Sequence, residues 1–146
     1  MIIKSFITPI GNFDAIYVDT LLTSLVFLNS HKSNHPPDKN LQKSIDIFFT
    51  KNGSYVPPKL NLQGTLFQLR VWNALMSIPR GCTESYGSLA RKIGAPGAAR
   101  AVGTACKMNP IPLFVPCHRV VRQNGSIGEF ALGKDNKEYL LAMESK

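Results

Sequence analysis

One short stretch of the chain, residues 111–121, constrains the fold more than any other. It reads Ile-Pro-Leu-Phe-Val-Pro-Cys-His-Arg-Val-Val. An apolar run of this length that closes with a proline predicts a buried strand with an abrupt end at Pro116. Cys117 would then lie where a rigid element meets a loop, a place where reactive groups are often found. The alternative is an ordinary buried cysteine, because free cysteine is among the most buried residue types.

The charge of the chain limits the kind of partner it can have. The 146 residues carry a formal net charge of +8, and their 44% apolar content indicates a globular fold. Residues 65–146 hold 11 Lys and Arg against 5 Asp and Glu, whereas residues 1–64 hold 6 against 4. The positive surplus therefore accompanies Cys117. It favours nucleic acid as the partner, with a membrane surface as the second choice.

Cysteine usage and the N-terminus predict the compartment. Three cysteines, at positions 82, 106 and 117, are too few for a disulfide framework and indicate a reducing environment. Cys82 and Cys106 have no activating neighbour in sequence, so we expect structural roles for both. The first residues lack a signal-peptide pattern, and the longest N-terminal apolar run, residues 21–28, is too short to cross a bilayer. We expect a cytoplasmic, intracellular protein with no membrane partner.

Residues 1–58 predict a small N-terminal β/α domain with a structural role. Period-2 patterns predict strands near residues 2–7, 13–19 and 22–28. Asp38 can cap a helix over residues 39–51, and the break at 53–58 predicts a boundary, so that 59–146 form a second domain. The two histidines of the polar segment 29–38 are expected to be solvated.

Two short helices form a candidate DNA-binding surface in the second domain. Residues 85–94 and 97–107 are separated by a tight turn, which resembles a helix-turn-helix, although a plain helical hairpin remains an alternative. Ala99, Ala101 and Gly103 would let the second helix approach a backbone closely. Arg100 gives this helix a long, positively charged side chain. Such a helix suits the minor groove, where little base identity is read.

The motifs together resemble the O6-alkylguanine-DNA alkyltransferases, also called the methylated-DNA–protein-cysteine methyltransferase family. The resemblance rests on Pro-Cys-His-Arg-Val-Val at 116–121, on Asn-Pro-Ile-Pro at 109–112 and on Ala-Arg-Ala-Val-Gly at 99–103. It extends over about residues 55 to 144. It implies an α/β fold with an RNase H-like arrangement for residues 1–58. For residues 59–146 it implies a winged-helix-like, DNA-binding domain with a helix-turn-helix.

The resemblance also implies a chemistry, which is DNA repair by stoichiometric, irreversible transfer of an alkyl group from O6-alkylguanine to Cys117. O4-alkylthymine is a further candidate substrate. A thiol with a pKa of about 8.5 is mostly protonated at neutral pH, so a proton acceptor is needed. The family implies His118 acting through a water molecule and oriented by Glu144. It also implies Tyr86 as a donor toward guanine N3, and Arg100 as the side chain that replaces the extruded nucleotide.

The resemblance assigns the remaining residues to the substrate pocket or to structural support. The pocket residues are Val120, Phe130, Ala131 and Leu132, and the supporting residues are Asn109 and Arg119, the latter either structural or facing a phosphate. Glu129 and Ala131 depart from the family pattern, because a small or neutral residue and a hydroxyl are more usual there. We expect Leu132 to narrow the pocket opening, so that free O6-benzylguanine reacts slowly.

No cofactor motif is present, and the cysteines with which some members of this family bind zinc are missing, so we expect neither cofactor nor metal. The expected partner is double-stranded DNA bearing O6-alkylguanine, bound by a monomer mainly through the minor groove. Two rival interpretations stay open. One is a lesion-binding relative without transfer activity, although such relatives replace the cysteine. The other is a cysteine hydrolase, which would leave the positive surplus unexplained.

Overall fold

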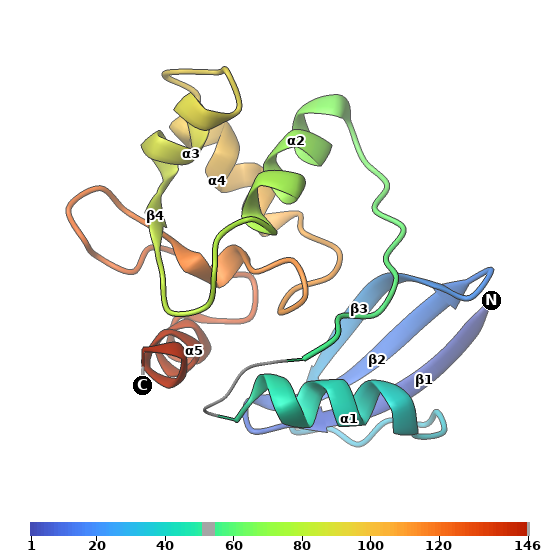
Figure 1. The fold of residues 1–146 in the computed structure, drawn as a ribbon. Coiled ribbons are helices and arrows are strands. Elements are labelled where there is room, and N and C mark those ends of the chain that lie inside the picture. The colour runs from blue at the N-terminus through green and yellow to red at the C-terminus, as the bar shows by residue number, and fades with distance from the viewer. Residues whose placement is uncertain (51–54, 146) are drawn as a thin grey trace. The chain divides into compact units, whose positions relative to one another are not determined.

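The structure, a computed structural model, describes residues 1–50 and 55–145. It divides into two compact units that adjoin between Leu62 and Gln63. Five α-helices and two small sheets occur in the described residues, which confirms the predicted α/β class (Figure 1). The start of the predicted break, Gly53, lies outside these residues. Across the described ranges, no helix is long and apolar enough to cross a membrane.

The first unit is an antiparallel sheet with one helix. Strands β1 (Ile2–Thr8), β2 (Gly11–Val18) and β3 (Leu21–Asn29) pair in chain order, as Figure 1 shows. Helix α1 (Lys39–Phe48) begins where the Asp38 carboxylate accepts a hydrogen bond from the Leu41 N–H at 3.0 Å. Its buried residues are Leu41, Ile45 and Phe48. Their spacing places them on one face, so burying that face against the sheet stabilises the unit.

In its described residues, the second unit contains four α-helices. They are α2 (Leu66–Leu75), α3 (Tyr86–Lys92), α4 (Ala99–Lys107) and α5 (Lys134–Glu144). Thr65 and Gln68 form a capping box at the start of α2. Strands β4 (Glu84–Ser85) and β5 (Val120–Val121) form a short parallel pair. This pair brings the start of α3 beside the residues that follow Cys117.

The prediction of a strand over residues 111–116 is wrong, although the prediction of burial is correct. Residues Ile111–Val115 form a tight turn closed by a Pro112–Val115 bridge, and Leu113 has a φ of +76°. Prolines at positions 110, 112 and 116 lack the N–H that a strand ladder needs. The turn is held instead by Asn109, whose side chain donates to the Val115 carbonyl at 2.7 Å and accepts from the Ile111 N–H at 2.9 Å.

The residues after the turn are helical rather than extended. Cys117–Arg119 form a single turn of 3₁₀ helix, in which successive side chains point about 120° apart. Helix α5 does not bury the whole of its apolar run at residues 139–141. Tyr139 is 46% exposed, and the buried side chains are Lys137, Leu140 and Glu144. The inward face of α5 therefore carries two charged side chains, Lys137 and Glu144.

A substitution at Trp72 tests how α2 and α4 are held together. Its indole N–H donates to the carbonyl of Ala105 in α4 at 2.9 Å, and its side chain is buried. A Trp72→Phe variant keeps an aromatic ring but leaves that buried carbonyl without its donor. We expect a loss of about 1–3 kcal/mol in the free energy of unfolding, measured by urea denaturation. Leu66→Ala, at an 80% exposed position of α2, is the control and should change little; equal effects of both variants would contradict this role.

Candidate active site

A pocket of about 550 Å³ opens in the second unit beside α4. Most of its wall comes from α4 and from the loop after β5, and Tyr86 and Cys117 complete it. The lining residues that the sequence assigned to the site are Tyr86, Ala99, Arg100, Gly103, Cys117, Phe130 and Ala131. Arg122 and Lys107 line it as well, so the thiol faces a cavity with basic residues in its wall.

Cys117 is a buried thiol that the free protein keeps protonated. Burial raises its pKa to about 11 despite three opposing influences, which are hydrogen bonding from the Asn109 side chain, the positive charge of Lys137 and the backbone N–H. Only 3% of the residue is exposed. Because the thiolate is the nucleophile, the thiol must lose its proton before it can react.

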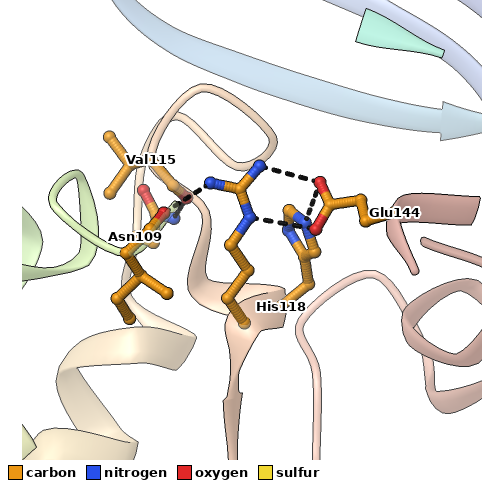
Figure 2. Close-up of polar contacts among 6 residues, drawn as sticks. Asn109, Val115, His118 and Glu144 are labelled. Carbon is orange, nitrogen blue, oxygen red and sulfur yellow. Dashed lines mark hydrogen bonds and ion pairs between the residues drawn. The ribbon is translucent and has the colours of Figure 1, made fainter. Parts of the chain in front are cut away.

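His118, Arg119 and Glu144 form a buried hydrogen-bonded cluster (Figure 2). His118 Nε2 lies 2.9 Å from Glu144 Oε2. Arg119 Nε donates to Glu144 Oε1 at 2.9 Å, and its Nη2 donates to Oε2 at 2.8 Å. The remaining Arg119 contact is a 2.7 Å bond from Nη1 to the Ile78 carbonyl. Arg119 is thus turned inward to hold Glu144, which supports the structural interpretation of this residue over a phosphate contact.

The cluster fixes the tautomer of the histidine. Burial opposes ionisation of Glu144, but hydrogen bonds from His118 and Arg119 outweigh it and lower the pKa of the carboxyl group to about 2. Glu144 is therefore an ionised acceptor at neutral pH. Burial lowers the pKa of His118, although Glu144 opposes this, so the imidazole is neutral. Its proton must be on Nε2, which donates to Glu144, and Nδ1 is then the basic nitrogen.

Tyr86 lies at the start of α3 with its ring against two glycines. A Cβ at Gly128, whose φ is +77°, would lie 3.2 Å from the Tyr86 hydroxyl, and one at Gly103 would lie 3.8 Å from the ring. Burial, with added repulsion from Cys106 and Cys117, raises the pKa of Tyr86 to about 12. The phenol therefore stays protonated and can donate a hydrogen bond into the pocket that it lines.

Lys137 is a buried cation that the sequence reasoning missed. Its Nζ donates to the Val120 carbonyl at 2.6 Å and to the Glu129 carbonyl at 3.2 Å, and it lies 3.5 Å from the Tyr86 hydroxyl. Burial lowers its pKa. Lysine is rarely buried, which is why its identity alone gave no signal. Its position gave one, because Lys137 lies seven residues before Glu144 and so on the same face of α5.

The other predicted residues lie around this pocket in different ways. On α4, Arg100 and Ala101 are exposed, whereas Ala99 and Gly103 are half-buried. Ala101, Val120 and Leu132 are not among the lining residues. Val120 contributes its carbonyl to Lys137 instead. Exposed Glu129 forms a salt bridge with Lys107, which joins the loop after β5 to the end of α4.

Comparison with known proteins identifies the family. Residues 66–146 match the family model described as 6-O-methylguanine DNA methyltransferase, DNA binding domain. The methylated-DNA–protein-cysteine methyltransferase of Methanosarcina acetivorans is 38% identical over 148 residues, which cover 95% of this chain and 95% of that protein. This chain belongs to the methylated-DNA–protein-cysteine methyltransferase family.

Two further methyltransferase relatives support this assignment. The protein of that name from Mycolicibacterium paratuberculosis is 53% identical over 88 residues, which are 60% of this chain and 53% of that protein. The crystal structure of Mycobacterium tuberculosis OGT in complex with DNA has 37% sequence identity and a TM-score of 0.89. That match covers 99% of this chain and 93% of the other. The family predicted from the motifs is therefore confirmed.

Glu144 is the residue of this methyltransferase whose loss we expect to cost most. Glu144→Gln removes the charge that Arg119 pairs with inside the protein. Breaking a buried ion pair in this way costs about 3–5 kcal/mol, because an uncompensated charge stays buried. Urea denaturation at neutral pH measures the change. Glu138→Gln, at an exposed position of the same helix, is the control; a Glu144 variant as stable as this control would contradict the role.

The same carboxyl group predicts an acid-dependent loss of stability. Its folded pKa of about 2 lies below the unfolded value of about 4.3. The stabilisation is therefore complete above about pH 4.3 and is lost as the pH falls toward 2. We expect the free energy of unfolding of the parent protein to fall more steeply across this window than that of Glu144→Gln. Parallel curves for the two proteins, from urea denaturation at several pH values, would rule out this contribution.

Proposed function

We propose that this chain is a methylated-DNA–protein-cysteine S-methyltransferase that repairs DNA by direct alkyl transfer from guanine O6 to Cys117. The observation that carries the proposal is the Cys117 thiol in a pocket walled by α4, in a chain of this family. In the transfer, the bond between the alkyl carbon and O6 breaks and a carbon–sulfur bond forms. The thiol gives up its proton, and the guanine gains one.

The proposed base is His118. Because Glu144 accepts a hydrogen bond from the Nε2–H, the imidazole is held in the tautomer whose unprotonated Nδ1 can take a proton from Cys117 through an intervening water molecule. Placing charge on sulfur is costly in this buried site, as the high pKa of Cys117 indicates. The nearby Lys137 cation offsets part of that cost, since its charge favours the thiolate.

The proposed proton donor is Tyr86. A departing guanine anion needs a proton, and Tyr86 keeps its own because its pKa is about 12. Lys137, 3.5 Å from the hydroxyl and 5.7 Å from the ring centre, holds a positive charge beside the phenol. The carbonyls of Val120 and Cys117 are candidate acceptors for the guanine amino group, although Lys137 already donates to that of Val120. Phe130 and Ala131 line the pocket in which the base would lie.

The proposed DNA-binding element is α4, acting in the minor groove of a duplex that bears O6-alkylguanine. Its small residues Ala99, Ala101 and Gly103 permit close approach to the groove, and exposed Arg100 would enter the base stack as the nucleotide is extruded. The protein would act inside the cell as a monomer, because one chain contains every residue that the reaction uses.

The product is a thioether on Cys117, so the proposed reaction occurs once per molecule. None of the residues that line the pocket offers a route to cleave a carbon–sulfur bond. This distinguishes the proposal from its two rivals. A lesion-binding protein would hold the modified base and leave the thiol unchanged, and a cysteine hydrolase would turn over many equivalents of an ester or peptide.

Intact-mass analysis after incubation with a duplex containing O6-methylguanine tests the proposal. We expect one added methyl group per protein, located on Cys117 by peptide mapping, and unmodified guanine in the DNA. Cys117→Ala should gain no methyl group, whereas Cys82→Ser, which changes an exposed thiol outside this pocket, should still be methylated. Restoration of guanine by Cys117→Ala would overturn the mechanism, and tight binding without a mass change would support the lesion-binding rival.

Removing the charge of Glu129 tests how the charge around the pocket affects DNA binding. In the free protein it neutralises Lys107 through an exposed salt bridge, and such bridges contribute little to stability. Glu129→Gln should leave the unfolding midpoint nearly unchanged but free Lys107 for phosphate. We expect tighter DNA binding with a salt dependence steeper by about one counterion, measured by fluorescence anisotropy over a range of salt. Glu138→Gln changes the net charge equally outside the pocket lining, and an equal effect there would contradict a local role.

A further inference from the structure

Cys106 is a second thiol in the wall of the pocket that contains Cys117. It comes from the last turn of α4, whereas Cys117 comes from the 3₁₀ turn, and both line the same cavity. Both are free, and both are buried. The remaining cysteine, Cys82, is exposed and lines a different pocket. We had expected a purely structural role for Cys106, but its place in the pocket wall gives it access to whatever enters.

The two thiols share one electrostatic environment. Burial raises the pKa of Cys106 to about 12, with a further contribution from the negative charge that Cys117 would carry, while Lys137 opposes the change. Cys117 has the same two main influences, burial and Lys137, alongside Asn109. The effect of a charge on Cys117 on the pKa of Cys106 is consistent with two side chains that line one cavity. At neutral pH the pocket therefore presents two S–H groups rather than a thiolate.

Two protonated thiols at one site suit a particular reaction. A trivalent organoarsenical, R–As(OH)₂, exchanges each hydroxyl for a sulfur: two As–S bonds form, two As–O bonds break, and the two thiol protons leave in two water molecules. Arsenic stays trivalent, so no oxidant or reductant is needed. Soft sulfur ligands favour such soft centres. Once the first sulfur is attached, the second bond forms within one molecule at a high effective concentration.

We propose that Cys106 and Cys117 together form a dithiol site that binds trivalent organoarsenicals by bridging both sulfur atoms. The site does not depend on the proposed alkyl transfer, because it uses only the two thiols and the cavity between α4 and the 3₁₀ turn. A bound arsenical would occupy Cys117, and it would therefore block that residue from any other reaction.

Phenylarsine oxide, at one equivalent to the reduced full-length protein, is the probe. Intact mass should show one phenylarsenic group with two thiol hydrogens lost. Iodoacetamide added afterwards should label Cys82 alone. Peptide mapping of the parent protein locates the label, so this step needs no variant. Labelling of Cys106 or Cys117 under these conditions, or loss of Cys82 labelling, would overturn the proposal.

Competition with glutathione separates a bridged adduct from a single As–S bond. The adduct of the parent and of Cys82→Ser should resist glutathione about 100-fold better than that of Cys106→Ala, because only a bridged arsenical gains from the second bond. Equal resistance in parent and Cys106→Ala would refute the bridging. Methyl acceptance by the untreated parent protein is measured separately, so a failure of alkyl transfer and a failure of the dithiol site give different results.

Discussion

The buried carboxylate of Glu144 is the interaction on which the second unit depends. It is the last residue of α5, and it accepts from His118 and Arg119, which are adjacent in the 3₁₀ turn. A single turn of 3₁₀ helix has little stability of its own, so its geometry must be imposed from outside. Two hydrogen bonds from the Arg119 guanidinium provide that constraint. Cys117, the neighbour of His118, is positioned through the same attachment.

Helix α5 therefore positions the site through two residues on one of its faces, Glu144 and Lys137. Lys137 lies two turns before Glu144, and it donates to carbonyls on both sides of the pocket loop, those of Val120 and Glu129. Glu144, at one end of this face, fixes the tautomer of His118. Lys137, at the other end, holds the loop beside Tyr86. Leu140, which lies between Lys137 and Glu144 in the chain, is buried and supplies apolar packing. Charged groups at these positions cost desolvation, and their hydrogen bonds to ions and carbonyls offset that cost.

The sequence predicted elements better than the connections between them. The capping box at Thr65 and the buried face of α1 follow local rules of spacing, and the structure has both. The turn at residues 111–116 does not follow such a rule, because its backbone groups are satisfied by Asn109 rather than by a neighbouring strand. Lys137 was missed for a similar reason. Its spacing from Glu144 indicated a shared face of α5, but the carbonyls that compensate its burial belong to residues distant in the chain.

Motif spacing, in contrast, located the pocket. Arg100, Cys117 and Tyr86 are far apart in the chain, and all three line one cavity. Cys106 shows the limit of this reasoning, since nothing next to it in sequence indicates a role. Only the fold, which brings α4 and the 3₁₀ turn to one cavity, places it in the same wall as Cys117.

The proline-rich turn has a consequence for the unfolded chain. Residues 111–115 are apolar throughout, and in an extended form such a segment would offer a template for pairing with other chains. Prolines at 110, 112 and 116 interrupt the row of N–H donors on which intermolecular strand pairing relies. The constraint that shapes the turn in the native state therefore also protects newly made or refolding molecules from aggregation at their most apolar functional segment.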